Sequence, residues 1–161
     1  MTRGQVIKKV RESRAAGRRA DLRGANLTGV DLRGVDLAYG DLTNAIFTGG
    51  TLRNATLTRT NLTGVDLRGV NLTGADLDYV ALRGANLTDA TLTRANLADA
   101  DLTYAWLESA NLTTKQLLDA RGLQTEAYGL HRDTWDQLLL SDGWDGTLRE
   151  AIETVEGLAG R

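Results

Sequence analysis

The stretch that decides the fold begins Ala20-Asp21-Leu22-Arg23-Gly24, Ala25-Asn26-Leu27-Thr28-Gly29, Val30-Asp31-Leu32-Arg33-Gly34. The same five-residue phase continues without a slip to Thr114, which makes 19 consecutive pentads. The middle position is Leu in 18 of them and Phe47 in the other, and the first position is always Ala, Val, Gly or Thr. An unbroken column at a fixed period indicates a repeat architecture.

A period of five excludes long helices and ordinary strands. An apolar face recurs every 3.6 residues in a helix and every 2 in a strand, so neither keeps a fifth-residue Leu on one side. A solenoid does so if each pentad forms one short side of a coil and turns its Leu and its small residue inward. The fifth position, often Gly, then turns the corner, where an unusual backbone angle is needed.

The pentads also resemble a known family. Ala25-Asn26-Leu27-Thr28-Gly29 and Ala110-Asn111-Leu112-Thr113-Thr114 are similar to the A-[D/N]-L-x-x motif of the pentapeptide-repeat proteins. The resemblance implies an all-β fold, a right-handed quadrilateral parallel β-helix with four pentads per coil. Residues 20–114 would then form just under five coils, roughly 23 Å tall at ~4.8 Å per coil. Residues 20 apart would stack on one face.

This stacking leads to expectations about particular side chains. Phe47 is the one oversized core residue, and we expect Gly40 and Gly50 to make room for its ring, because overpacking costs roughly 1–3 kcal/mol. Tyr39, Arg59 and Tyr79 would stack as a cation–π column, with three unrelated surface residues as the open alternative. Two outward residues, Ile46 and Trp106, are apolar, and we expect the C-terminal segment to cover Trp106.

The two ends of the solenoid call for caps, because an open coil exposes its core and its strand edges. Residues 1–19 form the N-terminal cap, with a helix predicted over 4–16 that puts Val6, Ile7 and Val10 on one side and ends at Gly17. Residues 115–161 form a helical C-terminal segment. It would begin with a short helix over 115–120, N-capped by Thr114.

Further along that segment, helices are expected over 133–140 and from the capping box Thr147-x-x-Glu150 onward. Seven large apolar residues there exceed what one open coil needs, which predicts a homodimer through this segment. Family members of the topoisomerase-binding kind also dimerise through C-terminal elements. The alternative is that all seven pack over Trp106 and the last Leu layer. The seven are Trp135, Leu138, Leu139, Trp144, Leu148, Ile152 and Val155.

The charge is unevenly distributed. The net charge of −2 divides into +6 for residues 1–19, −4 for 20–114 and −4 for 115–161. The total is too small to indicate bulk nucleic-acid binding. We interpret the basic side of the N-terminal helix as a solvated surface in preference to a phosphate-binding arm. With no Cys, no apolar run near ~18 residues and no apolar region after the basic N-terminus, we expect a cytoplasmic protein without membrane segments.

Residue types that could act in catalysis or bind a metal do not form recognisable motifs in the sequence. His131 is the only His and there is no Cys, so a zinc site is not expected. Neither Ser109 nor Ser141 lies in a nucleophile motif, and no phosphate-loop or dinucleotide fingerprint occurs. We therefore predict a protein that is not an enzyme and has no cofactor.

Three functions stay open. The family resemblance implies a binding protein that protects DNA gyrase from inhibitors, although this chain lacks the strong acidity and the projecting loops of those members. For that role the candidate partner-binding strip is Asp21, Asp31, Asp36 and Asp41, or Asp66 and Asp76. A rigid protein-interaction scaffold with an unknown partner is the second possibility. Ice binding through Thr73, Thr93 and Thr113 is the third, although Arg33 and Arg53 interrupt that column.

Overall fold

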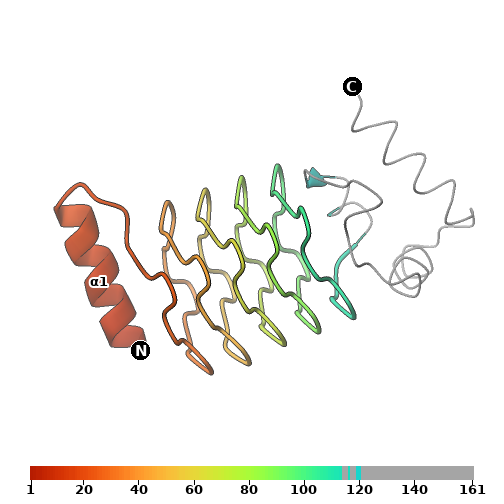
Figure 1. The fold of residues 1–161 in the computed structure, drawn as a ribbon, viewed down its shortest axis with the longest axis horizontal. Helices are drawn as coiled ribbons and strands as arrows, with labels where there is room; N and C mark the ends of the chain where they lie inside the picture. The colour runs from red at the N-terminus through yellow and green to blue at the C-terminus, as the bar shows by residue number, and fades with distance from the viewer. Residues whose placement is uncertain (114–115, 117–118, 121–161) are drawn as a thin grey trace, which may run out of the picture.

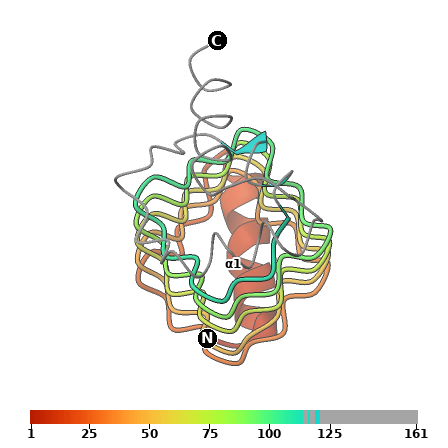
Figure 2. The same cartoon turned by 90° about the vertical axis from the view of Figure 1, so that its right-hand side faces the viewer.

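The computed structural model describes residues 1–113, 116, 119 and 120. One helix, α1 (Arg3–Ala15), precedes a stack of coils that runs from Ala20 to the end of the described residues. Figure 1 shows α1 lying across the N-terminal end of the stack, and Figure 2, along the stack, shows coils of four-sided outline. The described residues therefore run as one helix followed by a stack of coils.

Parallel backbone pairing holds the coils together at a fixed spacing of 20 residues. Fifteen single-residue bridges, from Asp21–Asp41 to Thr91–Asn111, all join the second positions of pentads 20 residues apart. From Leu22 to Leu92, each Leu amide of the middle column also donates to a carbonyl of the next coil, as in Leu22 N to Asp41 O at 2.7 Å. The spacing confirms four pentads per coil.

The corners are tight turns, and they have one backbone conformation throughout. In each turn the amide of a small residue donates to the preceding Leu carbonyl, as in Ala25 N to Leu22 O at 3.1 Å. The fifth residue has a positive φ in every described pentad from Gly24 to Ser109. Glycine adopts this conformation freely, which confirms why it recurs there, yet ten of these positions are not glycine.

The interior is a dry column of Leu and small side chains. Every Leu in the middle column from Leu22 to Leu112 is buried, and Phe47 is fully buried among them. The inward hydroxyl of Thr60 is also fully buried and donates to Leu37 O at 2.9 Å, so it leaves no unmatched donor. The core accounts for the inward half of each pentad without any functional role.

The expected role of Gly40 and Gly50 is wrong. A Cβ at Gly40 would lie 2.9 Å from Leu37 O, and one at Gly50 would lie 2.9 Å from Val30 O. None of the nearest atoms belongs to the Phe47 ring. Backbone carbonyls lie too close to these two positions for a Cβ. Glycine is therefore required by the path of the main chain and not by the volume of the Phe47 ring.

Helix α1 is tied to the first coil at its start and along one side. Its N-cap is Thr2, whose hydroxyl accepts from Gln5 N, while the Gln5 side chain accepts from Thr2 N. Val6 and Val10 are buried in the same core as the Leu column, and Ile7 packs against it. The helix therefore covers apolar surface that the first coil would otherwise expose.

A second capping box lies at the other end of the coils and begins one residue before Thr114, the predicted N-cap. Thr113 Oγ1 accepts from Gln116 N at 3.2 Å, and Gln116 Oε1 accepts from Thr113 N at 2.8 Å. The Gln116 amide also donates to Leu92 O and Ala95 O, two carbonyls of the last coil. Thr113 and Gln116 thus form the reciprocal pair of hydrogen bonds of a capping box, while Thr114, the predicted N-cap, lies outside the described residues.

Candidate functional surface

The 20-residue spacing sorts the outward side chains into four faces. We name them by their first outward residue: the Asp21 face (20–24 and every 20 residues on), the Asn26 face (25–29 and on), the Asp31 face (30–34 and on) and the Asp36 face (35–39, 55–59, 75–79 and 95–99). The Asp36 face has four acidic residues against one basic, whereas the Asp31 face has one against three. The small net charge of the body therefore conceals two faces of opposite sign.

The six carboxylates of the predicted strip do not form one surface. Asp21 and Asp41 are paired neighbours on the Asp21 face. Asp31 and Asp66 lie on two further faces, and Asp36 and Asp76 share the Asp36 face with Thr56 between them. The N-terminal group of four is thus spread over three sides of the solenoid.

Most of these carboxylates are neutralised locally by arginine. Three pairs join the second and fourth positions of one pentad: Asp21–Arg23 at 2.9 Å, Asp31–Arg33 at 2.6 Å and Asp66–Arg68 at 2.7 Å. Hydrogen bonds from Arg23 and Arg33 lower the pKa of Asp21 and of Asp31 to about 2. The Arg68 side chain lowers the pKa of Asp66 in the same way. These Asp residues stay ionised, but each would meet a partner as an ion pair with its Arg and not as a free negative charge.

The Asp36 face differs because its central carboxylates have no arginine. Asp36 itself pairs with Arg14 of α1 at 2.6 Å, and this hydrogen bond lowers its pKa. Asp76 instead accepts from Thr58 Oγ1 at 2.7 Å and from the amide of Asn96 at 3.0 Å. Within the described residues, neither Asp76 nor Asp78 forms a salt bridge. The middle of this face therefore carries two half-buried carboxylates that no arginine of the described coils pairs with.

The corner next to these carboxylates has an unusual composition. It carries Tyr39, Arg59, Tyr79 and Asp99, with φ values of 62°, 57°, 53° and 54°. The other three corners each contain glycines, and this one contains none. An L-residue in the left-handed region is disfavoured by roughly 1–2 kcal/mol, and a bulky one is a genuine outlier. The chain therefore accepts strain at every step of this corner.

We call Tyr39, Arg59 and Tyr79 the tyrosine ridge. The Arg59 guanidinium lies 5.2 Å from the centre of the Tyr79 ring, which confirms one half of the predicted cation–π column. Tyr39 is 54% exposed and Tyr79 is 44% exposed. Strained residues persist where function requires their side chains, and Tyr and Arg are the residues that dominate protein interfaces. The ridge and the carboxylates Asp76 and Asp78 make this edge the candidate functional surface.

The other exposed apolar residues are scattered. Ile46 and Trp106 share the Asn26 face but are separated along it by Asp66 and Asn86. They are 40% and 59% exposed. The segment predicted to cover Trp106, and the seven apolar residues of the predicted dimer interface, lie outside the described residues.

In the part of the chain that the structure describes, no group of His, Cys, Asp or Glu is arranged to hold a metal ion. Over the same residues, no helix has the length and apolarity needed to cross a membrane.

Comparisons with known proteins point to one family. A family model described as pentapeptide repeats matches residues 18–54, 41–74, 52–89 and 75–113, which is more than half of the chain. No curated protein matches the chain.

Among solved structures, a trypsin-treated variant of QnrB1, a plasmid-mediated fluoroquinolone resistance protein, is 26% identical with a TM-score of 0.55. The match covers 58% of this chain and 45% of QnrB1, so the chain spans less than half of that protein. A pentapeptide repeat protein from Nostoc PCC 7120 is 29% identical over 69% of this chain and 88% of its own, with a TM-score of 0.44.

Proposed function

The chain belongs to the pentapeptide-repeat family, and from this premise we propose that it is a non-enzymatic, cytoplasmic binding protein whose partner is DNA gyrase or a related type II topoisomerase. It would protect that enzyme from inhibitors. The observation that carries the proposal is the pairing of an arginine-free acidic patch, Asp76 and Asp78, with the strained tyrosine ridge. The likeness of the fold to QnrB1, a fluoroquinolone resistance protein, supports this choice of partner.

Charge density argues against mimicry of DNA by the whole surface. Duplex DNA carries one charge per ~1.7 Å, so a rod of about 23 Å would need about 14, and residues 20–114 have a net charge of −4. The Asp36 face alone has four carboxylates over three coil spacings, roughly 14 Å. One DNA strand has a phosphate every ~3.4 Å, which is a similar density before Arg14 and Arg59 are counted. The proposed contact is therefore local.

The two parts of the surface would contribute differently. The half-buried carboxylates Asp76 and Asp78 attract a basic partner surface over distances up to the screening length of about 8 Å at physiological salt. The two tyrosine rings and the Arg59 guanidinium then supply contact area with few rotatable bonds. The proposal includes a homodimer through residues 115–161, which would present two such edges to one partner.

A supercoiling assay with purified gyrase and a quinolone tests the proposal. We expect the full-length chain to change gyrase activity or its sensitivity to the drug, and Asp76→Asn with Asp78→Asn to weaken that effect. The matched control is Asp89→Asn with Glu108→Gln, which removes the same charge from the Asn26 face. No inhibition, protection or binding at low salt would contradict the choice of gyrase and favour a scaffold with another partner.

A further inference from the structure

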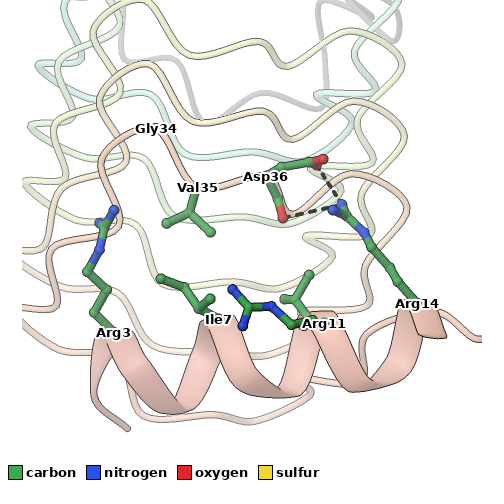
Figure 3. A pocket seen from close by; sticks show the side chains of 8 residues that line it. Arg3, Ile7, Arg11, Arg14, Gly34, Val35 and Asp36 are labelled. Carbon is green, nitrogen blue, oxygen red and sulfur yellow. Dashed lines mark hydrogen bonds and ion pairs between the residues drawn. The ribbon is translucent and has the colours of Figure 1, made fainter. Parts of the chain in front are cut away.

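A groove lies between α1 and the first coil. Its volume is about 340 Å³, and it is lined by Arg3, Ile7, Val10, Arg11, Arg14, Gly34, Val35 and Asp36. Figure 3 shows Ile7 and Val35 facing one another across it, with Arg3 and Arg14 at its two ends. The groove thus combines an apolar floor with a cationic rim.

The three arginines of the rim are not equivalent. Arg3 donates to Asp31 O and Arg33 O at 2.8 and 2.9 Å, and Arg14 is paired with Asp36. Both therefore fasten α1 to the coil. Arg11 has no hydrogen-bond or salt-bridge partner among the described residues, although it lies between the other two in Figure 3. The Arg11 guanidinium can therefore bind an anionic group beside the apolar floor of the groove.

The chain contains a segment whose chemistry is the complement of this groove. Leu148, Ile152 and Val155 follow the i, i+4, i+7 spacing of one helical side, as Arg3, Ile7 and Val10 do on α1. Glu150, Glu153 and Glu156 recur every three residues, which matches the separation of Arg11 and Arg14. Residues 121–161 contain eight acidic and four basic residues, whereas residues 1–19 have a net charge of +6.

We propose that the groove on α1 of one copy binds residues 147–156 of a second copy. The proposal rests on the homodimer of the proposed function and names the surface that receives its C-terminal segment. Leu148, Ile152 and Val155 would lie on the apolar floor, and Glu153 would pair with Arg11. Two chains that exchange this contact reciprocally close a dimer with two identical contacts, whereas one-way exchange would grow a filament.

Sedimentation of the full-length chain at micromolar concentration tests the contact. Arg11→Glu should weaken the dimer about tenfold at low salt and less at high salt, because the pair is exposed to screening. The matched control is Lys8→Glu, which makes the same charge change on α1 outside the groove. Glu153→Arg should weaken the dimer as Arg11→Glu does, and the two together should recover most of the loss.

Recovery in the charge-exchanged double variant would support the contact, because a general effect of charge on solubility or folding would not be reversed. If Arg11→Glu dimerises as tightly as Lys8→Glu does, the homodimer stands but the groove is not its receiving surface. If the unaltered chain is a monomer, both the homodimer and this contact are overturned. Circular dichroism of each variant shows whether the fold is kept.

Discussion

Exchanging Tyr39 for Gly removes the more exposed of the two tyrosine rings of the ridge, and we expect it to change the stability of the solenoid only slightly. The φ of Tyr39 is 62°, where an L-residue is disfavoured by roughly 1–2 kcal/mol. Against this relief stand the greater freedom of Gly in the unfolded chain, about 0.5–1 kcal/mol, and the contacts of the partly covered ring. The opposing terms nearly cancel, so the free energy of unfolding should change by less than about 1 kcal/mol.

Gly84→Tyr is the reciprocal control. Gly84 has a φ of 62°, and no atom lies within 4 Å of a Cβ added there, so a ring fits sterically and only the backbone is strained. This change should cost about 1 kcal/mol, or about 2–4 °C in the melting temperature. Thermal and denaturant unfolding measure both variants. If Tyr39→Gly lowers the free energy of unfolding by more than about 2 kcal/mol, the Tyr39 ring has a structural role and the functional explanation of the ridge is wrong.

Three further predictions concern the core, the ion pairs and the C-terminal capping box. Leu72→Asp should prevent folding, because Leu72 is fully buried, whereas Thr73→Asp should change stability by less than about 0.5 kcal/mol; equal effects on circular dichroism would contradict the inward and outward assignment. Arg23→Ala should raise the pKa of Asp21 from about 2 toward 3.8, measured by NMR titration. Since the folded pKa lies below the unfolded one, this carboxylate stabilises the fold above about pH 4, and the contribution disappears as the pH falls through about 2. Gln116→Ala should cost about 1–2 kcal/mol in chemical denaturation, because two carbonyls of the last coil lose their donor; an unchanged midpoint would show that the box is dispensable.

Much of this architecture could be predicted because the repeat encodes it position by position. The Leu column and the N-terminal helix follow from where apolar and small residues recur, whereas the 20-residue spacing was implied by the resemblance to the pentapeptide-repeat family. The role given to Gly40 failed because pattern alone treats a missing side chain as space for another side chain. The structure shows that nearby carbonyl groups occupy that space.

The candidate surface was harder to predict for two physical reasons. The four faces of a coil separate residues that are close in sequence, so Asp31 and Asp36 point to different sides despite lying five residues apart. An Asp followed two residues later by Arg, as in Asp21 and Arg23, also forms an ion pair within its own pentad. The list of acidic positions alone does not show this pairing. The backbone strain of tyrosine at a corner is evident only from the φ angles. The absence of Gly from the fifth position of the Asp36 face was the sequence feature that could have indicated it.

The most direct test of the central claim is calorimetric binding of the full-length chain to purified gyrase at low and at high salt. We expect binding that weakens as salt rises, is reduced by Asp76→Asn with Asp78→Asn, and is also reduced by Tyr39→Gly, whose stability is kept. The Asp89→Asn and Glu108→Gln control should bind as the unaltered chain does. Equal affinity for all of these variants, or no heat of binding at any salt concentration, would contradict the claim that the Asp36 face and its ridge form the partner-binding surface.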